Sequence, residues 1–361
     1  MRQLFPSLQR LRSLLWYHVA LCSISIALAL HALSLALLIE TRKGGLRQLI
    51  PSANFKHSHA IRRRQISMEA GSGPSDPYAY CRDFVRKHDY ESFLNSYFYP
   101  RHAQKGYFAI KAFSVELATV QDNVSNAMIG KMRMQFWRDA IKGLSDGRPP
   151  KHPIALALFE TSRQQRLSAY HLKRIIDARD AELSTPSHLT VDSLTAHAES
   201  TSSTVLYLLL SLLSLPSSTL SHAASHLGAA QTFSTLLRAL PYHAKHGRMV
   251  IPAEITAKHR VSQEDVFRHG PDAEGIEDAV FEFATLAHDH LNTARTTLTT
   301  ADGANGRVPR EAMSVFLPGV PVSNYLKRLE KSGFNVFDAS LQAKDGWLPL
   351  QMWWSNCKAL F

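Results

Sequence analysis

The residues best able to do chemistry gather in one short segment beyond the middle of this 361-residue chain. Arg238 and Arg248 carry planar guanidinium groups that can hold a phosphate or a carboxylate through paired hydrogen bonds. His243 and His246 are three residues apart, so on a helix they would share a face and could bind a transition metal. Pro241 precedes them and favours a bend or loop, which makes incidental histidines and structural ion pairs for the arginines the simpler interpretation.

The segment from Leu227 to Pro252 reads LGAAQTFSTLLRALPYHAKHGRMVIP. It resembles the motif LG.ALQ.TNILRDVGED...GR.YLP, the second diphosphate-binding motif of the squalene/phytoene synthase family. Where that family has two aspartates the chain has Ala239 and His243, and at the intervening glutamate it has Tyr242. The resemblance therefore implies that the helical framework is kept and that the metal-binding carboxylates are lost.

A second segment, AIKAFSVELATVQDN from Ala109 to Asn123, is similar to the first acidic motif of the same family, ALYAFCR..DD.VDE. The paired aspartates are replaced by Ala118 and Thr119, and only Asp122 remains. That isolated carboxylate could coordinate an ion, but such a group is more usually solvated or paired. Because magnesium requires oxygen ligands, usually carboxylates, the resemblance implies no metal, no cofactor and no catalytic residue.

Longer strings refine this resemblance. The segments Met132–Leu158 and Leu172–Leu183 match other helices of the family, and VELATVQDNVS and IGKMRMQFWRDAI resemble its non-enzymatic mitochondrial branch. That branch acts in the assembly of respiratory NADH:ubiquinone oxidoreductase (complex I). The resemblance implies a non-catalytic assembly factor on the matrix side of the mitochondrial inner membrane, with complex I subunits or assembly intermediates as partners. The alternatives are a prenyl transferase with a rewired metal site and an isoprenoid- or lipid-binding protein that keeps the family's cavity.

The net charge of +11 is concentrated at the N-terminus, because residues 1–68 hold ten Lys and Arg against a single acidic residue. The rest of the chain is nearly neutral, so the basic composition does not indicate nucleic-acid binding. Three widely spaced cysteines exclude a disulfide framework and a structural zinc site. The sequence contains no HExxH, P-loop or dinucleotide-binding fingerprint.

Residues 1–68 have the Arg- and Ser-rich composition of a mitochondrial transit peptide. Within them residues 14–39 are uncharged and mostly apolar, a stretch long enough to insert into a membrane. Two alternatives stay open: a membrane-inserting leader, or a segment absent from the mature protein. We expect a linker at residues 69–77, a helical domain at 78–345 and a C-terminal tail at 346–361.

The domain is predicted to be all-α and isoprenoid-synthase-like, because no segment sustains the alternation of a strand. Predicted helices are Tyr78–His88 with Asp76 as N-cap, Phe108–Val124, Ile129–Leu144, a buried central run within Ala198–Leu215, and one or two helices over Ser217–Arg238. The apolar residues expected to pack or to line a cavity are Met132, Met134, Phe136 and Trp137.

Two surfaces are candidates for recognition: the segment around Tyr242 and His243, and the paired tryptophans Trp353 and Trp354 near the C-terminus. Tyrosine and tryptophan are favoured at interfaces, because each offers a large rigid apolar area with one polar end. Paired tryptophans in a tail bury against the domain, touch a membrane or anchor a partner, and the sequence does not choose among these. The candidate ligand or partner residues are Arg238, Tyr242, His243, Arg248, Trp353 and Trp354.

Overall fold

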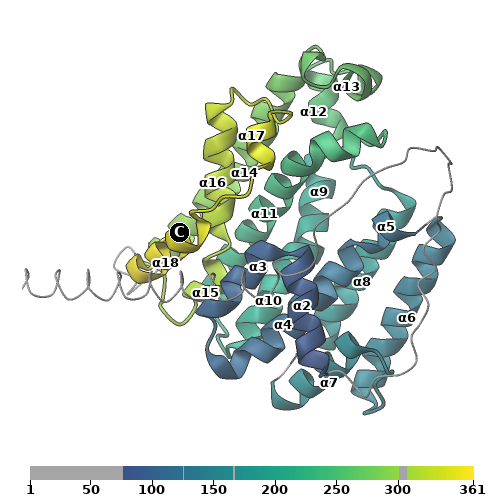
Figure 1. Ribbon diagram of the computed structural model, residues 1–361, viewed down its shortest axis with the longest axis vertical. Helices are drawn as coiled ribbons and strands as arrows, with labels where there is room; N and C mark the ends of the chain where they lie inside the picture. Colours follow the sequence, from purple (N-terminus) through teal and green to yellow (C-terminus); the bar gives the residue numbers. More distant parts are fainter. Residues whose placement is uncertain (1–75, 125, 166, 301–306) are drawn as a thin grey trace, which may run out of the picture. The chain divides into compact units, whose positions relative to one another are not determined.

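A computed structural model describes residues 76–124, 126–165, 167–300 and 307–361 of the chain. Every regular element within these ranges is helical (Figure 1), which confirms the all-α prediction. Outside the described residues lie the predicted leader 1–68, its apolar stretch 14–39 and most of the linker 69–77.

The first helix follows the predicted capping pattern, since the Asp76 carboxylate accepts the Tyr78 N–H at 3.1 Å and Pro77 opens the helix. In chain order the helices are α2 (Pro77–His88), α3 (Tyr90–Asn95), η1 (Ser96–Phe98), α4 (Arg101–Ala118), α5 (Val120–Asn123), α6 (Ala127–Ser145), α7 (Pro153–Gln164), α8 (Ala169–Ser184), α9 (Val191–Ala198), the π-helical turn η2 (Glu199–Ser203), α10 (Thr204–Leu212), α11 (Ser218–Lys245), α12 (Ala253–Lys258), α13 (Gln263–His269), η3 (Gly270–Asp272), α14 (Ile276–Thr299), α15 (Met313–Phe316), α16 (Gly319–Lys331), α17 (Ala339–Gln342) and α18 (Leu348–Lys358).

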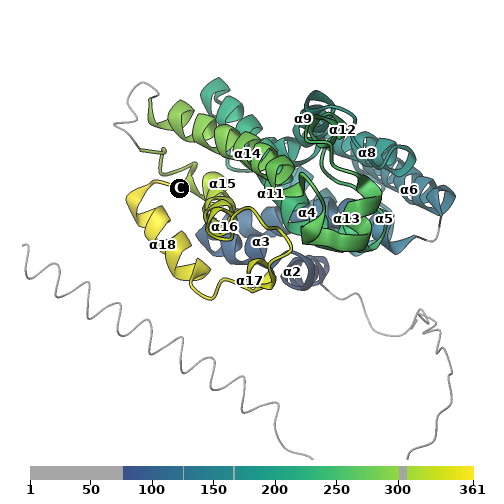
Figure 2. The ribbon, with the colours of Figure 1, turned by 90° about the horizontal axis from the view of Figure 1, so that it is seen from above.

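The long helix α11 forms the centre of the fold. Helix α14 lies beside it along much of its length (Figures 1 and 2), and α10, η2 and α16 pack on its other sides. Seven of the nine residues of α10 are buried, as predicted for the apolar run. None of the described helices combines the length and the apolar composition that a membrane span requires.

Helices α11 and η2 touch at Gly228. A Cβ built on Gly228 would lie 2.5 Å from the backbone N and 2.6 Å from the Cα of Ser203. The Ser203 hydroxyl donates to the Ser225 carbonyl of α11 at 2.9 Å, which holds the two helices at this separation. The neighbouring Ser202 thereby reaches the cavity described below.

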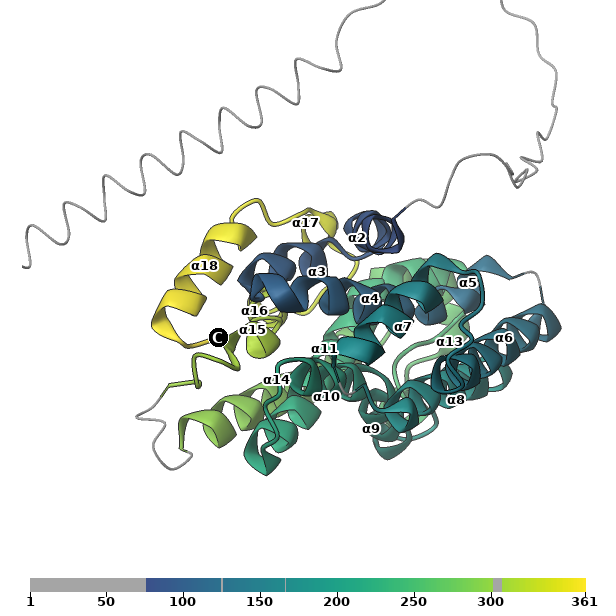
Figure 3. The same cartoon turned by 90° about the horizontal axis from the view of Figure 1, so that it is seen from below.

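Helix α6 packs on α8 at one side of the fold (Figures 1 and 3). Met134 and Trp137 are buried, whereas Met132 is 67% and Phe136 is 40% exposed. The expectation that all four residues pack or line a cavity was therefore wrong for Met132 and Phe136. Successive residues of an α-helix are rotated by about 100°, so Met134 and Trp137 lie on one side of the helix and Met132 and Phe136 on the other.

Helix α11 continues through Pro241 to Lys245, so the predicted bend or loop at this proline was wrong. A proline inside a helix removes one backbone hydrogen bond. Here Leu240 and Ala244 on either side of it are buried, and their packing offsets that loss.

The segment 346–361, predicted as a tail beyond the domain, folds as α18 and packs on α16. Leu348 and Met352 are buried, and the Val308 N–H donates to the Ala359 carbonyl at 2.9 Å. Residues Ala70–Phe361 accordingly form one compact unit that includes this helix.

Replacement of Gly228 by alanine tests the close contact between α11 and η2. We expect Gly228→Ala to lower the free energy of unfolding by about 1–3 kcal/mol, since the added methyl group meets backbone that cannot move aside. Gly130→Ala is the matched control, because its methyl group meets only the side chain of Leu183. Urea denaturation of both variants measures the difference, and equal stability of the two would contradict the close contact.

Candidate functional site

A cavity of about 340 Å³ opens between α3, α4, α10, α11 and α16. Its wall on α11 is polar and is formed by residues at helical spacing, namely Gln231, Ser234, Thr235 and Arg238. The part of the lining on α10 is apolar and consists of Val205, Leu206 and Leu209. The lining thus combines polar side chains of α11 with apolar side chains of α10.

The first acidic motif of the resemblance borders this cavity. Ala118 and Thr119, which stand where the paired aspartates are expected, both line it. Neither side chain carries a carboxylate, and Asp122 is not part of the lining. Within the described ranges, no group of three or more His, Cys, Asp and Glu side chains is placed to hold a metal ion.

Two ion pairs flank the cavity. Arg238 donates to the Glu91 carboxylate at 2.6 Å, and Lys111 Nζ lies 3.3 Å from Asp89 Oδ2. Burial opposes ionisation of Asp89, but Lys111 and the Ser92 backbone and hydroxyl groups together hold the pKa of Asp89 below its usual value. All four of these charged residues line the cavity, so each of the two cations has a carboxylate from the chain beside it.

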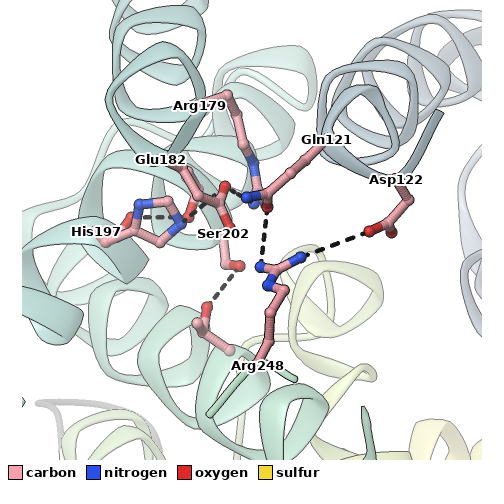
Figure 4. A network of polar contacts seen from close by, with 9 residues as sticks. Gln121, Asp122, Arg179, Glu182, His197, Ser202 and Arg248 are labelled. Carbon is pink, nitrogen blue, oxygen red and sulfur yellow. Dashed lines mark hydrogen bonds and ion pairs between the residues drawn. The ribbon is translucent and has the colours of Figure 1, made fainter. Parts of the chain in front are cut away.

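A second polar network lies next to Asp122 (Figure 4). Arg248 donates to the Gln121 side-chain carbonyl at 3.0 Å and lies 3.7 Å from the Asp122 carboxylate. Arg179 donates to Glu182 at 2.7 Å, and His197 lies 3.8 Å from the same carboxylate. These contacts join α5 to the segment after α11, and α8 to α9.

The network holds Glu182 ionised and His197 neutral. Burial alone would raise the pKa of Glu182, but the positive charges of Arg179 and Arg248 and the nearby His197 lower it. Burial and the charge of Arg179 lower the pKa of His197 to about 4. Burial and Arg248 likewise lower the pKa of His243. At neutral pH the arginines are therefore balanced by carboxylates, while these imidazoles carry no charge.

The structure separates the predicted recognition residues into four places. Arg238 lines the cavity, whereas Arg248 belongs to the second network with the half-buried His243 nearby. Tyr242 is exposed near the end of α11 and packs against His246, with their ring centres 4.4 Å apart and their planes tilted. The fourth place is α18, where Trp353 and Trp354 are exposed.

Sequence reasoning found both arginines and Asp122, the carboxylate beside Arg248, but missed Glu91, which pairs with Arg238. Glu91 lies 147 residues before Arg238, and such a long-range pair leaves no local pattern. The polar row from Gln231 to Arg238 was available as a signal, because its residues follow the spacing of one helix face. Glu182 and Arg179 lie in a segment already recognised as a helix of the family, but nothing local indicated their partners.

Acid should weaken the fold through His197. An imidazole with a lower pKa in the folded state binds its proton more readily in the unfolded chain, so stability falls as the pH drops from 6.5 to about 4. We expect the loss of unfolding free energy between about pH 7 and about pH 5 to be smaller by about 2 kcal/mol in His197→Gln than in the wild type. His102→Gln, at an exposed position of α4, is the control. An identical pH dependence for His197→Gln and the wild type, measured by urea denaturation, would contradict a buried neutral imidazole.

The chain resembles known proteins over most of its length. Residues 85–353 match the squalene/phytoene synthase family. The rat (Rattus norvegicus) protein named NADH dehydrogenase (ubiquinone) complex I, assembly factor 6 is 39% identical over 291 residues, covering 81% of this chain and 85% of that protein. The human protein of the same name is 36% identical over 290 residues, covering 80% of this chain and 85% of its own.

Solved structures agree in fold. A dehydrosqualene synthase crystallised with a ligand superposes with a TM-score of 0.66 at 15% sequence identity, covering 78% of this chain and 95% of that one. At this identity the likeness concerns the fold alone. It agrees with the sequence match, and the chain belongs to the squalene/phytoene synthase family.

Proposed function

We propose that the protein is a non-catalytic assembly factor of respiratory complex I. The observation that carries this proposal is its likeness, over about four fifths of the chain, to proteins that are named as complex I assembly factors. The likeness extends over about 85% of those relatives as well, so it is not confined to one shared segment. Complex I subunits or assembly intermediates are the partners that follow from the proposal.

The absence of catalysis is supported by the charges at the cavity. A prenyl synthase of this family holds a diphosphate through magnesium ions, which need carboxylate or phosphate oxygens. In this chain Ala118 and Thr119 offer no such ligands, and Asp122 is paired with Arg248. A prenyl transferase would have to break this pairing before it could bind metal, so we do not favour that alternative.

We further propose that the protein acts in mitochondria, on the matrix side of the inner membrane. The relatives are named for complex I, which is a respiratory enzyme of that membrane. The basic leader 1–68 would direct import, and its apolar stretch 14–39 would insert in the membrane if it is retained. No part of this proposal requires a nucleic-acid partner, since the folded unit is nearly neutral.

The surface of α18 is the better of the two candidate docking surfaces. Trp347, Leu350 and Trp354 are all exposed and are spaced three and four residues apart, so they share one helix face. Trp353 is also exposed, and Lys358 lies 4.6 Å from the ring centre of Trp354. An apolar face of this kind, edged by a cation, is typical of a surface that is covered by a partner. Tyr242 offers a single exposed aromatic ring by comparison.

A complementation experiment tests both the function and the surface. In cells lacking the gene, we expect the wild-type chain to restore complex I and the double variant Trp353→Ala/Trp354→Ala to restore little of it. The double variant should lose no more than about 1 kcal/mol of unfolding free energy, because both side chains are exposed. Complex I abundance is measured by native gel electrophoresis, and thermal unfolding of the purified variant checks the fold.

Tyr170→Ala is the matched control, because Tyr170 is a solvent-exposed aromatic residue at the start of α8. Normal complex I in cells lacking the protein would contradict the proposed function. Normal assembly with the tryptophan variant would instead reject α18 as the docking surface. The double variant Tyr242→Ala/His243→Ala would then be the next to examine.

A further inference from the structure

Two buried hydroxyl groups in the cavity wall have no hydrogen-bond partner among the described residues. They are Ser234 Oγ on α11 and Tyr325 Oη on α16, and their residues are only 4% and 5% exposed. Both residues line the cavity, and the two helices pack against each other. A buried hydroxyl without a partner costs about 1–3 kcal/mol, so a molecule that enters the cavity and bonds to these groups recovers that free energy.

The charges of the cavity exclude a strongly anionic group at this place. Arg238 is held by Glu91 at 2.6 Å, and Lys111 lies 3.3 Å from Asp89. An anion placed beside either cation would also lie close to the carboxylate that pairs with that cation. Its attraction to the cation and its repulsion from the carboxylate would then largely cancel. The polar end of a bound molecule is therefore uncharged.

The rest of the cavity favours an apolar chain. Val205, Leu206 and Leu209 of α10 form an apolar part of the lining, and Val322 and Met352 extend it on α16 and α18. The volume of about 340 Å³ is near the lower end of the range for small-molecule sites, roughly 300–1,000 Å³. A single chain with a small head group matches this volume and this division of polar and apolar walls.

We propose that the cavity binds an uncharged amphiphile whose hydroxyl or carbonyl head group bonds to Ser234 and Tyr325 and whose apolar chain lies against α10. The proposal rests on the absence of catalysis proposed above, because a cavity that holds magnesium and diphosphate would be organised around an anion. It goes further in naming the chemical class that the cavity takes and the two side chains that recognise it.

Isothermal titration calorimetry with 1-decanol and decyl phosphate tests this proposal on the purified protein. The two probes share one chain and differ in the charge of the head group. We expect 1-decanol to bind at least about tenfold more tightly than decyl phosphate, with or without magnesium. Ser234→Ala and Tyr325→Phe should each weaken the binding of 1-decanol by about five- to tenfold, since each removes one hydrogen bond to the head group.

The same variants give a second, independent readout without any ligand. Because each removes an unpartnered buried hydroxyl, the empty variants should have an unfolding midpoint temperature equal to or above that of the wild type. Tyr99→Phe is the matched control, because Tyr99 is a buried tyrosine that does not line the cavity. It should leave the affinity for 1-decanol unchanged.

Three results would overturn the proposal: no binding of 1-decanol to the wild type, equal or tighter binding of decyl phosphate, or unchanged affinity in both cavity variants. Failure of 1-decanol to bind would leave the assembly function standing, since that function is measured by complementation. Magnesium-dependent binding of decyl phosphate would count against the absence of catalysis as well. The outcomes thus separate the cavity proposal from the proposed function.

Discussion

A carboxylate from the chain itself pairs with each of the two arginines in the segment that resembles the family's second motif. The Glu91 carboxylate accepts a hydrogen bond from Arg238 at 2.6 Å, and the Asp122 carboxylate lies 3.7 Å from Arg248. Partly buried charges are tolerated when they are paired and hydrogen-bonded, and here the partners come from helices α3 and α5, far from α11 in the sequence. The first pair therefore ties α3 to the central helix α11, and the second ties α5 to the segment that follows α11.

The remaining features of the site depend on that pairing. Because Glu91 pairs with Arg238, the cavity lining holds a balanced ion pair beside Ala118, Thr119 and the hydroxyl groups of Ser234 and Tyr325. In the π-helical turn η2, Ser203 lies in close contact with Gly228 of α11. The neighbouring Ser202 therefore lies in the cavity wall. The proposed non-catalytic role and the proposed binding of an uncharged molecule thus rest on the same electrostatic arrangement.

The sequence predicted the helices better than their contacts. Asp76 and Pro77 fixed the start of α2, and the dense apolar run after Thr204 indicated a buried helix, because caps and burial leave local patterns. The predictions of a bend or loop at Pro241 and of a packed Met132 were wrong. The packing of neighbouring residues decides whether a helix tolerates a proline and which of its faces is covered. The substituted motif positions were readable from the resemblance, whereas Glu91 and Glu182 needed the folded chain to bring them to their partners.

We propose that internal ion pairs replace the family's metal and diphosphate site. The most direct test is to incubate the purified protein with farnesyl diphosphate and magnesium and to measure released inorganic diphosphate. Paired arginines and missing carboxylates predict no release above a protein-free control. A magnesium-dependent release that a chelator abolishes would contradict this account, because it would require the chain to open these pairs and assemble a metal site from the residues that remain.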